Sequence, residues 1–97
     1  MRDLEDKVLN KLKEVIDPEL GYDIVSLGEI EEIKVEDKKV YIKFLPTTPL
    51  CPFLPFIYSS IVQKMEELGL EAEVNIDYEG RWSIDRVDPE IRKKLNI

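Results

Sequence analysis

The sequence contains no histidine and only one cysteine, Cys51, among its 97 residues. Without histidine, one chain cannot form a Ser-His-Asp or Cys-His catalytic arrangement, a histidine-ligated zinc site or an imidazole acid–base pair. One cysteine cannot form an intramolecular disulfide, and a small domain without disulfides is typical of a reducing compartment. It also supplies a single thiolate, so a thiolate metal site would need a second chain. We therefore expect a cytoplasmic protein without these catalytic arrangements.

Long apolar runs and an excess of positive charge are also missing. No stretch approaches the roughly 18 apolar residues of a membrane span, and Met1–Asp6 lacks the apolar segment of a signal peptide. Asp and Glu number 21 against 14 Lys and Arg, for a net charge of −7, the wrong sign for tracking phosphates. We expect neither a membrane nor a nucleic acid as partner. Glutamine and asparagine are scarce beside Glu and Lys, a bias seen in heat-adapted proteins.

The residues that are present suit one small hydrophobic core. Hydrophobic residues make up 43% of the chain and charged residues 36%, a composition typical of globular proteins. The length lies near the small end of the usual domain size of roughly 100 to 150 residues. We therefore expect residues 1–97 to form a single domain.

Apolar residues at helical spacing predict two main helices. The first runs from Arg2 to Ile16 and ends at the Asp17–Gly21 turn, because a residue before proline is driven out of the helical region. The second begins at Pro52 and continues to Leu68, with Gly69 as the stop. A last short helix opens at Asp88-Pro89-Glu90.

Alternation of apolar and charged residues predicts three strands. Two flank the polar stretch Glu36–Lys39 as a β-hairpin, and the third covers Glu71–Glu79. A helix between the hairpin and the third strand favours parallel pairing through a right-handed crossover. We predict an α/β (α+β) fold of order helix, strand, strand, helix, strand, helix, with room for a further strand before the last helix. Its mixed sheet carries helices mainly on one face.

The proline-rich segment around Cys51 is the first candidate site. If Pro52 is the first helical residue, Cys51 is the N-cap and feels the positive end of the helix dipole. Such a setting favours the thiolate, which is the form that binds metal or attacks. Thr47 and Thr48 add hydroxyl donors. The alternative is that Cys51 is a small buried hydrophobic residue.

Asp17 and Glu19 form a second candidate pair, two carboxylates in one turn. The alternative is that Asp17 only caps the turn, as Asp88 does before its own Pro-Glu pair. Trp82 is interpreted as a lid on the core. The apolar run from Phe53 to Ile57 is interpreted as core or as a partner surface.

Four motifs occur in a fixed order along the chain: Asp17–Leu20 (Asp-Pro-Glu-Leu), Asp23–Gly28 (Asp-Ile-Val-Ser-Leu-Gly), Thr47–Pro52 (Thr-Thr-Pro-Leu-Cys-Pro), and Trp82 with Asp85-Arg86-Val87. Together they resemble the PaaD-like family of metal-sulfur cluster biosynthetic proteins. That family includes the SUF-associated assembly factor and the targeting factors of eukaryotic cytosolic iron-sulfur assembly. The resemblance extends from about Leu4 to Leu95.

The resemblance implies an iron-sulfur cluster assembly domain and a role in maturing iron-sulfur proteins rather than catalysis. It assigns the functional site to Asp17, to Thr47 or Thr48, and to Cys51, with Glu19, Gly28 and Pro52 as supporting turn residues. Asp17 beside the loop would orient or deprotonate the thiol.

The sequence departs from the family pattern at two positions. Glu29 follows Gly28 where the family usually has an apolar residue, and Leu50 precedes Cys51 where a small residue is common. The Cys-x-x-Cys of related scaffold domains is also absent, so one chain alone is not expected to scaffold a cluster.

The leading hypothesis is an accessory factor for iron-sulfur cluster assembly or delivery. The Cys51 thiolate would supply one ligand to a transient cluster or iron at a subunit interface, with nothing permanently bound. The expected partners are the assembly machinery, client apoproteins and a second copy of the chain in a homodimer. One alternative is an adaptor that recruits clients through its apolar surface without ligating a cluster. Another is a thiol enzyme that uses Cys51 with Asp17.

Overall fold

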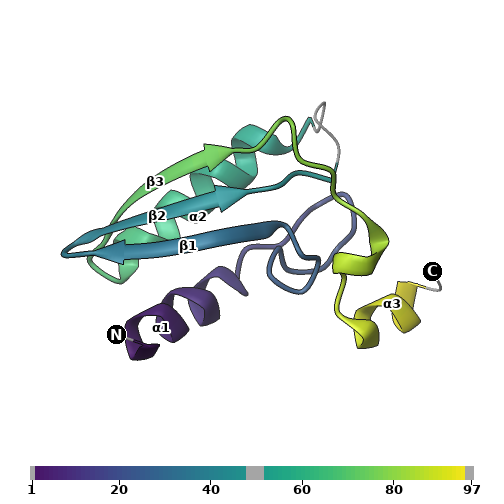
Figure 1. Ribbon diagram of the computed structural model, residues 1–97, viewed down its shortest axis with the longest axis horizontal. Coiled ribbons are helices and arrows are strands. Elements are labelled where there is room, and N and C mark those ends of the chain that lie inside the picture. The colour runs from purple at the N-terminus through teal and green to yellow at the C-terminus, as the bar shows by residue number, and fades with distance from the viewer. Residues whose placement is uncertain (1, 48–51, 96–97) are drawn as a thin grey trace.

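A three-stranded mixed sheet forms the centre of the computed structural model, which describes residues 2–47 and 52–95 (Figure 1). Strand β2 lies in the middle, antiparallel to β1 and parallel to β3. The elements in chain order are α1 (Arg2–Leu12), β1 (Ile30–Glu36), β2 (Lys39–Phe44), α2 (Leu54–Glu67), β3 (Glu71–Ile76), the 3₁₀ turn η1 (Ile84–Arg86) and α3 (Pro89–Leu95). The predicted fold class and the parallel pairing across α2 are confirmed.

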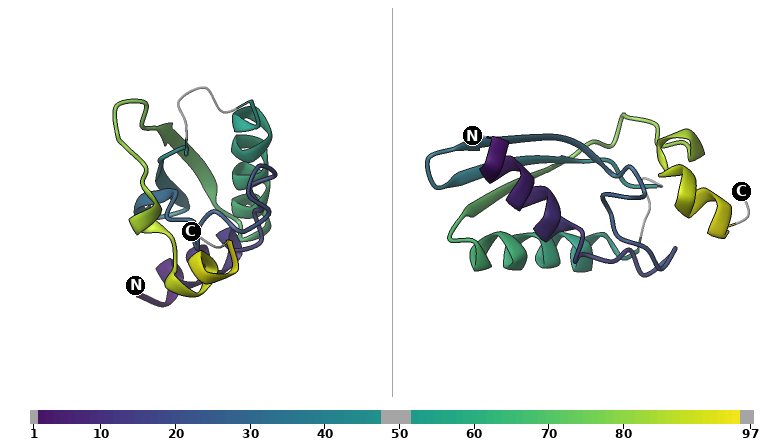
Figure 2. Two further views of the ribbon diagram at one scale, coloured as in Figure 1. Left: turned by 90° about the vertical axis from the view of Figure 1, so that its right-hand side faces the viewer. Right: turned by 90° about the horizontal axis from the view of Figure 1, so that it is seen from below.

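The core lies between the sheet and two helices. Figure 2 shows α2 against one face of the sheet, with α1 beside β1 and α2. Alternate residues of β2 point into this layer, as the period of a strand requires. The buried side chains that meet there include Val40, Ile42 and Phe44 from β2, Ile57, Ile61 and Met65 from α2, and Val8 and Leu12 from α1. The prediction that helices cover mainly one face is confirmed.

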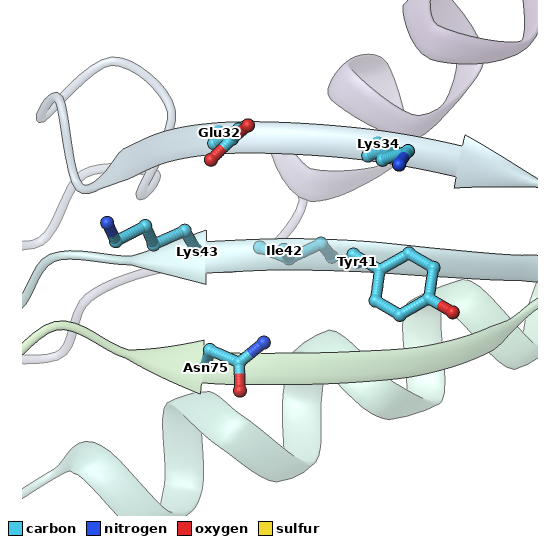
Figure 3. Close-up of a pocket in the computed structure, with 6 residues that line it drawn as sticks. All are labelled: Glu32, Lys34, Tyr41, Ile42, Lys43 and Asn75. Atoms are coloured by element: carbon cyan, nitrogen blue, oxygen red, sulfur yellow. The ribbon is translucent and has the colours of Figure 1, made fainter.

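The opposite face of the sheet is polar and exposed. It carries Lys34, Tyr41, Lys43 and Asn75 around a shallow hollow of about 340 Å³ (Figure 3). None of the predicted site residues lines this hollow. No helix in the described part of the chain is long and apolar enough to cross a membrane.

Helix α1 ends at Leu12 and not at Ile16 as predicted. The amides of Glu14 and Val15 donate to the carbonyls three residues before them, at 3.0 Å each. This 3₁₀-type spacing tightens the turn that follows the helix. Beyond it Ile16 forms an isolated antiparallel bridge with Asp23, and that pairing demands extended backbone. The apolar spacing continues through residues 15 and 16, but tertiary pairing overrides it.

Helix α2 begins at Leu54 rather than Pro52. Its N-cap is Phe53, a proline lies in its first turn, and the amide of Ile57 makes a 2.9 Å bond to the Phe53 carbonyl. Both Pro52 and Pro55 suit a helix start, and the structure uses Pro55. The prediction that Cys51 is the N-cap of this helix is therefore wrong.

Strand β3 ends at Ile76, three residues before the predicted end. The side chain of Asp77 accepts bonds from the amides of Glu79 (3.0 Å) and Gly80 (2.7 Å), so the chain turns there. The segment that was expected to allow a further strand forms η1 instead.

Candidate functional site

The loop between α1 and β1 lies at the end of the sheet where β2 and β3 finish, beside η1 and α3 (Figure 1). It contains the first two of the four sequence motifs. Residues at the carboxyl ends of adjacent parallel strands commonly border binding sites in α/β proteins. The site is built from this end of the molecule.

Asp17 is fully buried in the first turn of this loop, at 0% exposure. Its Oδ1 accepts a 2.8 Å bond from the amide of Glu19, and its own amide donates to the carbonyl of Tyr22 at 2.9 Å. Its carbonyl accepts from the amide of Gly21 at 2.7 Å. The turn-capping role is therefore real. Its Oδ2, however, has no hydrogen-bond partner among the described residues.

The second turn places the Asp23–Gly28 motif against the C-terminal segment. The indole N–H of Trp82 donates to the Leu27 carbonyl at 2.6 Å, and Nε of Arg86 donates to the Gly28 carbonyl at 2.7 Å. Trp82 is half-buried and is bound to this loop, and its interpretation as a lid on the core stays a prediction. The structure brings together two motifs that lie more than fifty residues apart in the sequence.

Gly28 is required by this contact. Its φ is +71°, and a Cβ atom at this position would overlap the backbone carbonyl of Arg86. Any side chain would therefore push the C-terminal segment away from the loop.

Glu29 is the residue that sequence reasoning treated only as a departure from the family pattern. It is buried at 1% exposure, and its Oε1 has no partner in the described part of the chain. Burial, followed by the neighbouring carboxyls of Asp17 and Glu19, raises the pKa of Glu29 to about 9. The available signal was an acidic residue directly between the apolar motif residues and Ile30.

The main chain of Glu29 leads toward the proline-rich segment. Its carbonyl accepts a 2.7 Å bond from the amide of Leu45. Leu45 and Pro46 are buried, and Thr47 is half-buried at the edge of the described chain. Thr48 and Cys51 lie outside the described residues, so the structure describes no geometry for the thiol. Pro52 is exposed.

The predicted apolar run from Phe53 to Ile57 divides into two parts. Ile57 is fully buried in the core, whereas Phe56 is 58% exposed. Phe56 lies beside Ile16 and Pro18 along a hollow of about 320 Å³ between the Asp17 turn and α2. The interpretation of this run as core is correct for Ile57. The exposed Phe56 lines the same hollow as the Asp17 turn.

No group of three or more acidic, histidine or cysteine side chains is placed to hold a metal ion within residues 2–47 and 52–95. Asp17 and Glu29 are the two buried charged-type residues in this part of the chain. Two carboxyls alone would leave the coordination shell of a cation incomplete.

The model of the iron-sulfur cluster assembly protein family matches residues 5–77. The chain belongs to this family. The matched span includes the Asp17 turn, the Asp23–Gly28 motif and the proline-rich segment. The predicted resemblance is therefore confirmed, and the Trp82 motif lies beyond the matched residues.

Curated relatives extend the match to nearly the whole chain. The Fe-S protein maturation auxiliary factor YitW of Bacillus subtilis is 30% identical over 97% of this chain and 95% of its own length. The Fe-S protein maturation auxiliary factor SufT of Staphylococcus aureus is 36% identical over 86% of this chain and 98% of its own. Both names describe auxiliary factors, which agrees with the expectation of a family without catalytic activity.

A solved structure shares the fold. The domain of unknown function DUF59 from Bacillus anthracis aligns with a TM-score of 0.91 and 30% identity, and the alignment covers 99% of this chain and 94% of that one. The fold of this chain is therefore one that solved structures already contain.

Proposed function

We propose that the protein is an accessory factor that assembles iron-sulfur clusters or delivers them to client proteins. The observation that carries this proposal is family membership over residues 5–77, together with near full-length relatives named as Fe-S protein maturation auxiliary factors. Residues 1–97 act as one domain in this proposal, in the cytoplasm.

The proposed ligand is the thiolate of Cys51. It is the only thiol in the chain, and soft thiolate suits iron and sulfide. A cluster or iron atom is cargo here, held briefly at an interface to which a second copy or a client contributes the other ligands. The proposed partners are the assembly machinery, client apoproteins and a homodimeric copy.

Asp17, Thr47 and Thr48 support the thiol in this proposal. Glu19, Gly28 and Pro52 shape the turns that hold them. Support comes from the burial of Asp17 and from the bond between Glu29 and Leu45, which joins the Asp17 loop to the strand end just before Thr47.

Anaerobic reconstitution with ferrous iron and sulfide tests the ligand role. We expect visible absorbance in a species with the mass of two chains, and no such species for Cys51→Ala. Cys51→Ser is the matched control, because it retains a side chain of similar size with a much poorer ligand for iron. A wild-type protein that stays a colourless monomer, alone and with an iron-sulfur apoprotein, would contradict the proposal.

An adaptor without cluster ligation is the second candidate function. The exposed Phe56, Ile16 and Pro18 around the hollow beside α2 favour it, because exposed apolar clusters mark interaction surfaces. The discriminating measurement is maturation of an iron-sulfur apoenzyme by Cys51→Ala and by Phe56→Glu. Full activity of the first and loss with the second would establish the adaptor. Tyr78→Glu is the control, since Tyr78 is 59% exposed.

A further inference from the structure

The two buried carboxyls, Asp17 and Glu29, belong to separate turns of one loop. Both are at most 1% exposed. None of the ion pairs in the described chain includes either of them. A buried carboxylate without a cation is unfavourable, and two neighbouring ones are more so.

Among residues 2–47 and 52–95, two carboxyl oxygens of this pair lack a hydrogen-bond donor. Oδ1 of Asp17 accepts from the Glu19 amide, while Oδ2 of Asp17 and Oε1 of Glu29 have no partner among the described residues. Two ionised carboxylates are acceptors only, whereas a protonated carboxyl also donates. One added proton therefore supplies the missing donor and removes one of the two buried charges.

Glu29 is the carboxyl that keeps the proton. Its burial and the approach of the Asp17 carboxyl both raise the pKa of Glu29, to about 9. Glu19, from the same turn as Asp17, is the other titratable group that acts on it. At neutral pH Glu29 is therefore a neutral acid beside Asp17.

We propose that Glu29 is a positioning residue for Asp17, a neutral acid whose O–H donates to the Asp17 carboxylate and so holds the two turns together through one shared proton. When the proton leaves for solvent at alkaline pH, two adjacent carboxylates remain and repel each other. The bond from the Leu45 amide to the Glu29 carbonyl couples such a displacement to the strand end before Thr47. The relevance of this lock for cluster handling rests on the proposed function, but the lock itself does not.

Carboxyl carbon NMR between pH 5 and pH 10 tests the shared proton in the intact protein. We expect the Glu29 carboxyl to remain protonated at pH 7 and to titrate near pH 9. The Glu19 amide donates to Asp17. The chemical shift of this amide should therefore change with the same midpoint as the Glu29 carboxyl. A Glu29 carboxyl that is fully ionised by pH 6 would overturn the proposal.

Two variants separate positioning from mere space filling. Glu29→Gln retains an N–H donor at every pH, so its Glu19 amide should match the wild type at pH 7 and lose the transition near pH 9. Glu29→Leu has no donor, so that amide should shift already at pH 7. Identical Glu19 signals in both variants would overturn the positioning role. If Glu29→Leu does not fold, the pH response of Glu29→Gln against the wild type decides.

Two further variants identify what the transition depends on. Glu19→Gln is the matched control, because Glu19 has the weakest influence on the pKa of Glu29. In this variant the midpoint of the Glu29 titration should fall only slightly. Cys51→Ala should keep the wild-type titration. A transition near pH 9 in a wild-type protein that iron and sulfide cannot reconstitute would support the lock and contradict the cluster role, so the two proposals fail separately.

Discussion

The outer face of the sheet and the loop from Asp17 to Glu29 are both rich in charged groups, but they differ in solvent access. On the outer face, Lys39 lies 4.0 Å from Glu73 and Lys34 lies 3.6 Å from Glu36, all substantially exposed. In the loop, two carboxyls are buried, and neither belongs to an ion pair among the described residues. The larger hollow is on the outer face, yet the unsatisfied groups are in the loop. Burial without a partner, rather than the number of charges or the size of a hollow, identifies the region with unusual chemistry.

The largest expected effect is on the pH dependence of stability. The pKa of Glu29 is about 9 in the fold against an ordinary 4.5, so its contribution to stability is present below pH 4.5 and is lost as pH rises toward 9. Glu29→Gln removes this loss. Its free energy of unfolding should gain on the wild type by on the order of 4 kcal/mol between pH 5 and pH 8, at about 1.4 kcal/mol per pH unit.

Urea unfolding at pH 5, 6.5 and 8 measures this difference. Parallel profiles for the two proteins would show that Glu29 ionises as readily in the fold as in the unfolded chain. The contrast between the loop and the outer face would then disappear.

The next effect concerns the contact that closes the loop. Gly28→Ala places a Cβ against the Arg86 carbonyl at a positive φ, and we expect a loss of about 3 kcal/mol in unfolding free energy. Gly21→Ala is the matched control, because Gly21 has a similar φ of +78° and open space around it. It should lose only about 1 kcal/mol. Equal losses in thermal or urea unfolding would mean that the Arg86 contact contributes nothing.

A smaller effect on stability is expected from loss of the hydrogen bond of the Trp82 indole. Trp82→Phe removes the donor to the Leu27 carbonyl, at a cost of about 1 kcal/mol. The loss should affect mainly the contact between the C-terminal segment and the loop, where the amide of Asp88 also donates to the carbonyl of Ser26. Faster hydrogen exchange at the Asp88 amide, with unchanged exchange in β2, is the expected result. Uniformly faster exchange would instead indicate global destabilisation.

The smallest effect belongs to the outer face. Glu73→Gln removes the partner of Lys39 where both side chains are exposed, and the expected change in unfolding free energy is below about 0.5 kcal/mol. The same measurement as for Glu29 applies. A larger loss would show that the outer face, despite its solvent, contributes specific electrostatic stabilisation.

Local patterns predicted the elements well where one face of an element is buried. The alternation of apolar and charged residues in β2 predicted both the strand and its buried face. The polar stretch Glu36–Lys39 contains the two-residue turn between β1 and β2. Element ends were less predictable. Helical spacing continues to Ile16, but pairing with Asp23 extends the chain there, and either Pro52 or Pro55 satisfies the requirements of a helix start.

The candidate site was predicted only in part. The Asp17 turn and its capping bond could be anticipated, since an Asp before Pro-Glu is a local signal. The burial of Glu29 could not, because it depends on how the loop between α1 and β1 folds back on itself. In the sequence, its acidic side chain in an apolar context marks only a departure from the family pattern. The assignment of Cys51 and Thr48 stays a prediction.

The absence of histidine and the single thiol are properties of the amino-acid sequence alone, and they exclude histidine-ligated and multi-thiolate metal sites within one chain. The helices and strands follow from local hydrophobic periodicity, which reflects short-range forces. The family follows from the order and spacing of the motifs. The meeting of Asp17 with Glu29, and of Gly28 with Arg86, was decided by the tertiary structure. Such contacts join separate turns, and whether a carboxyl there keeps its proton depends on what surrounds it once water has been excluded.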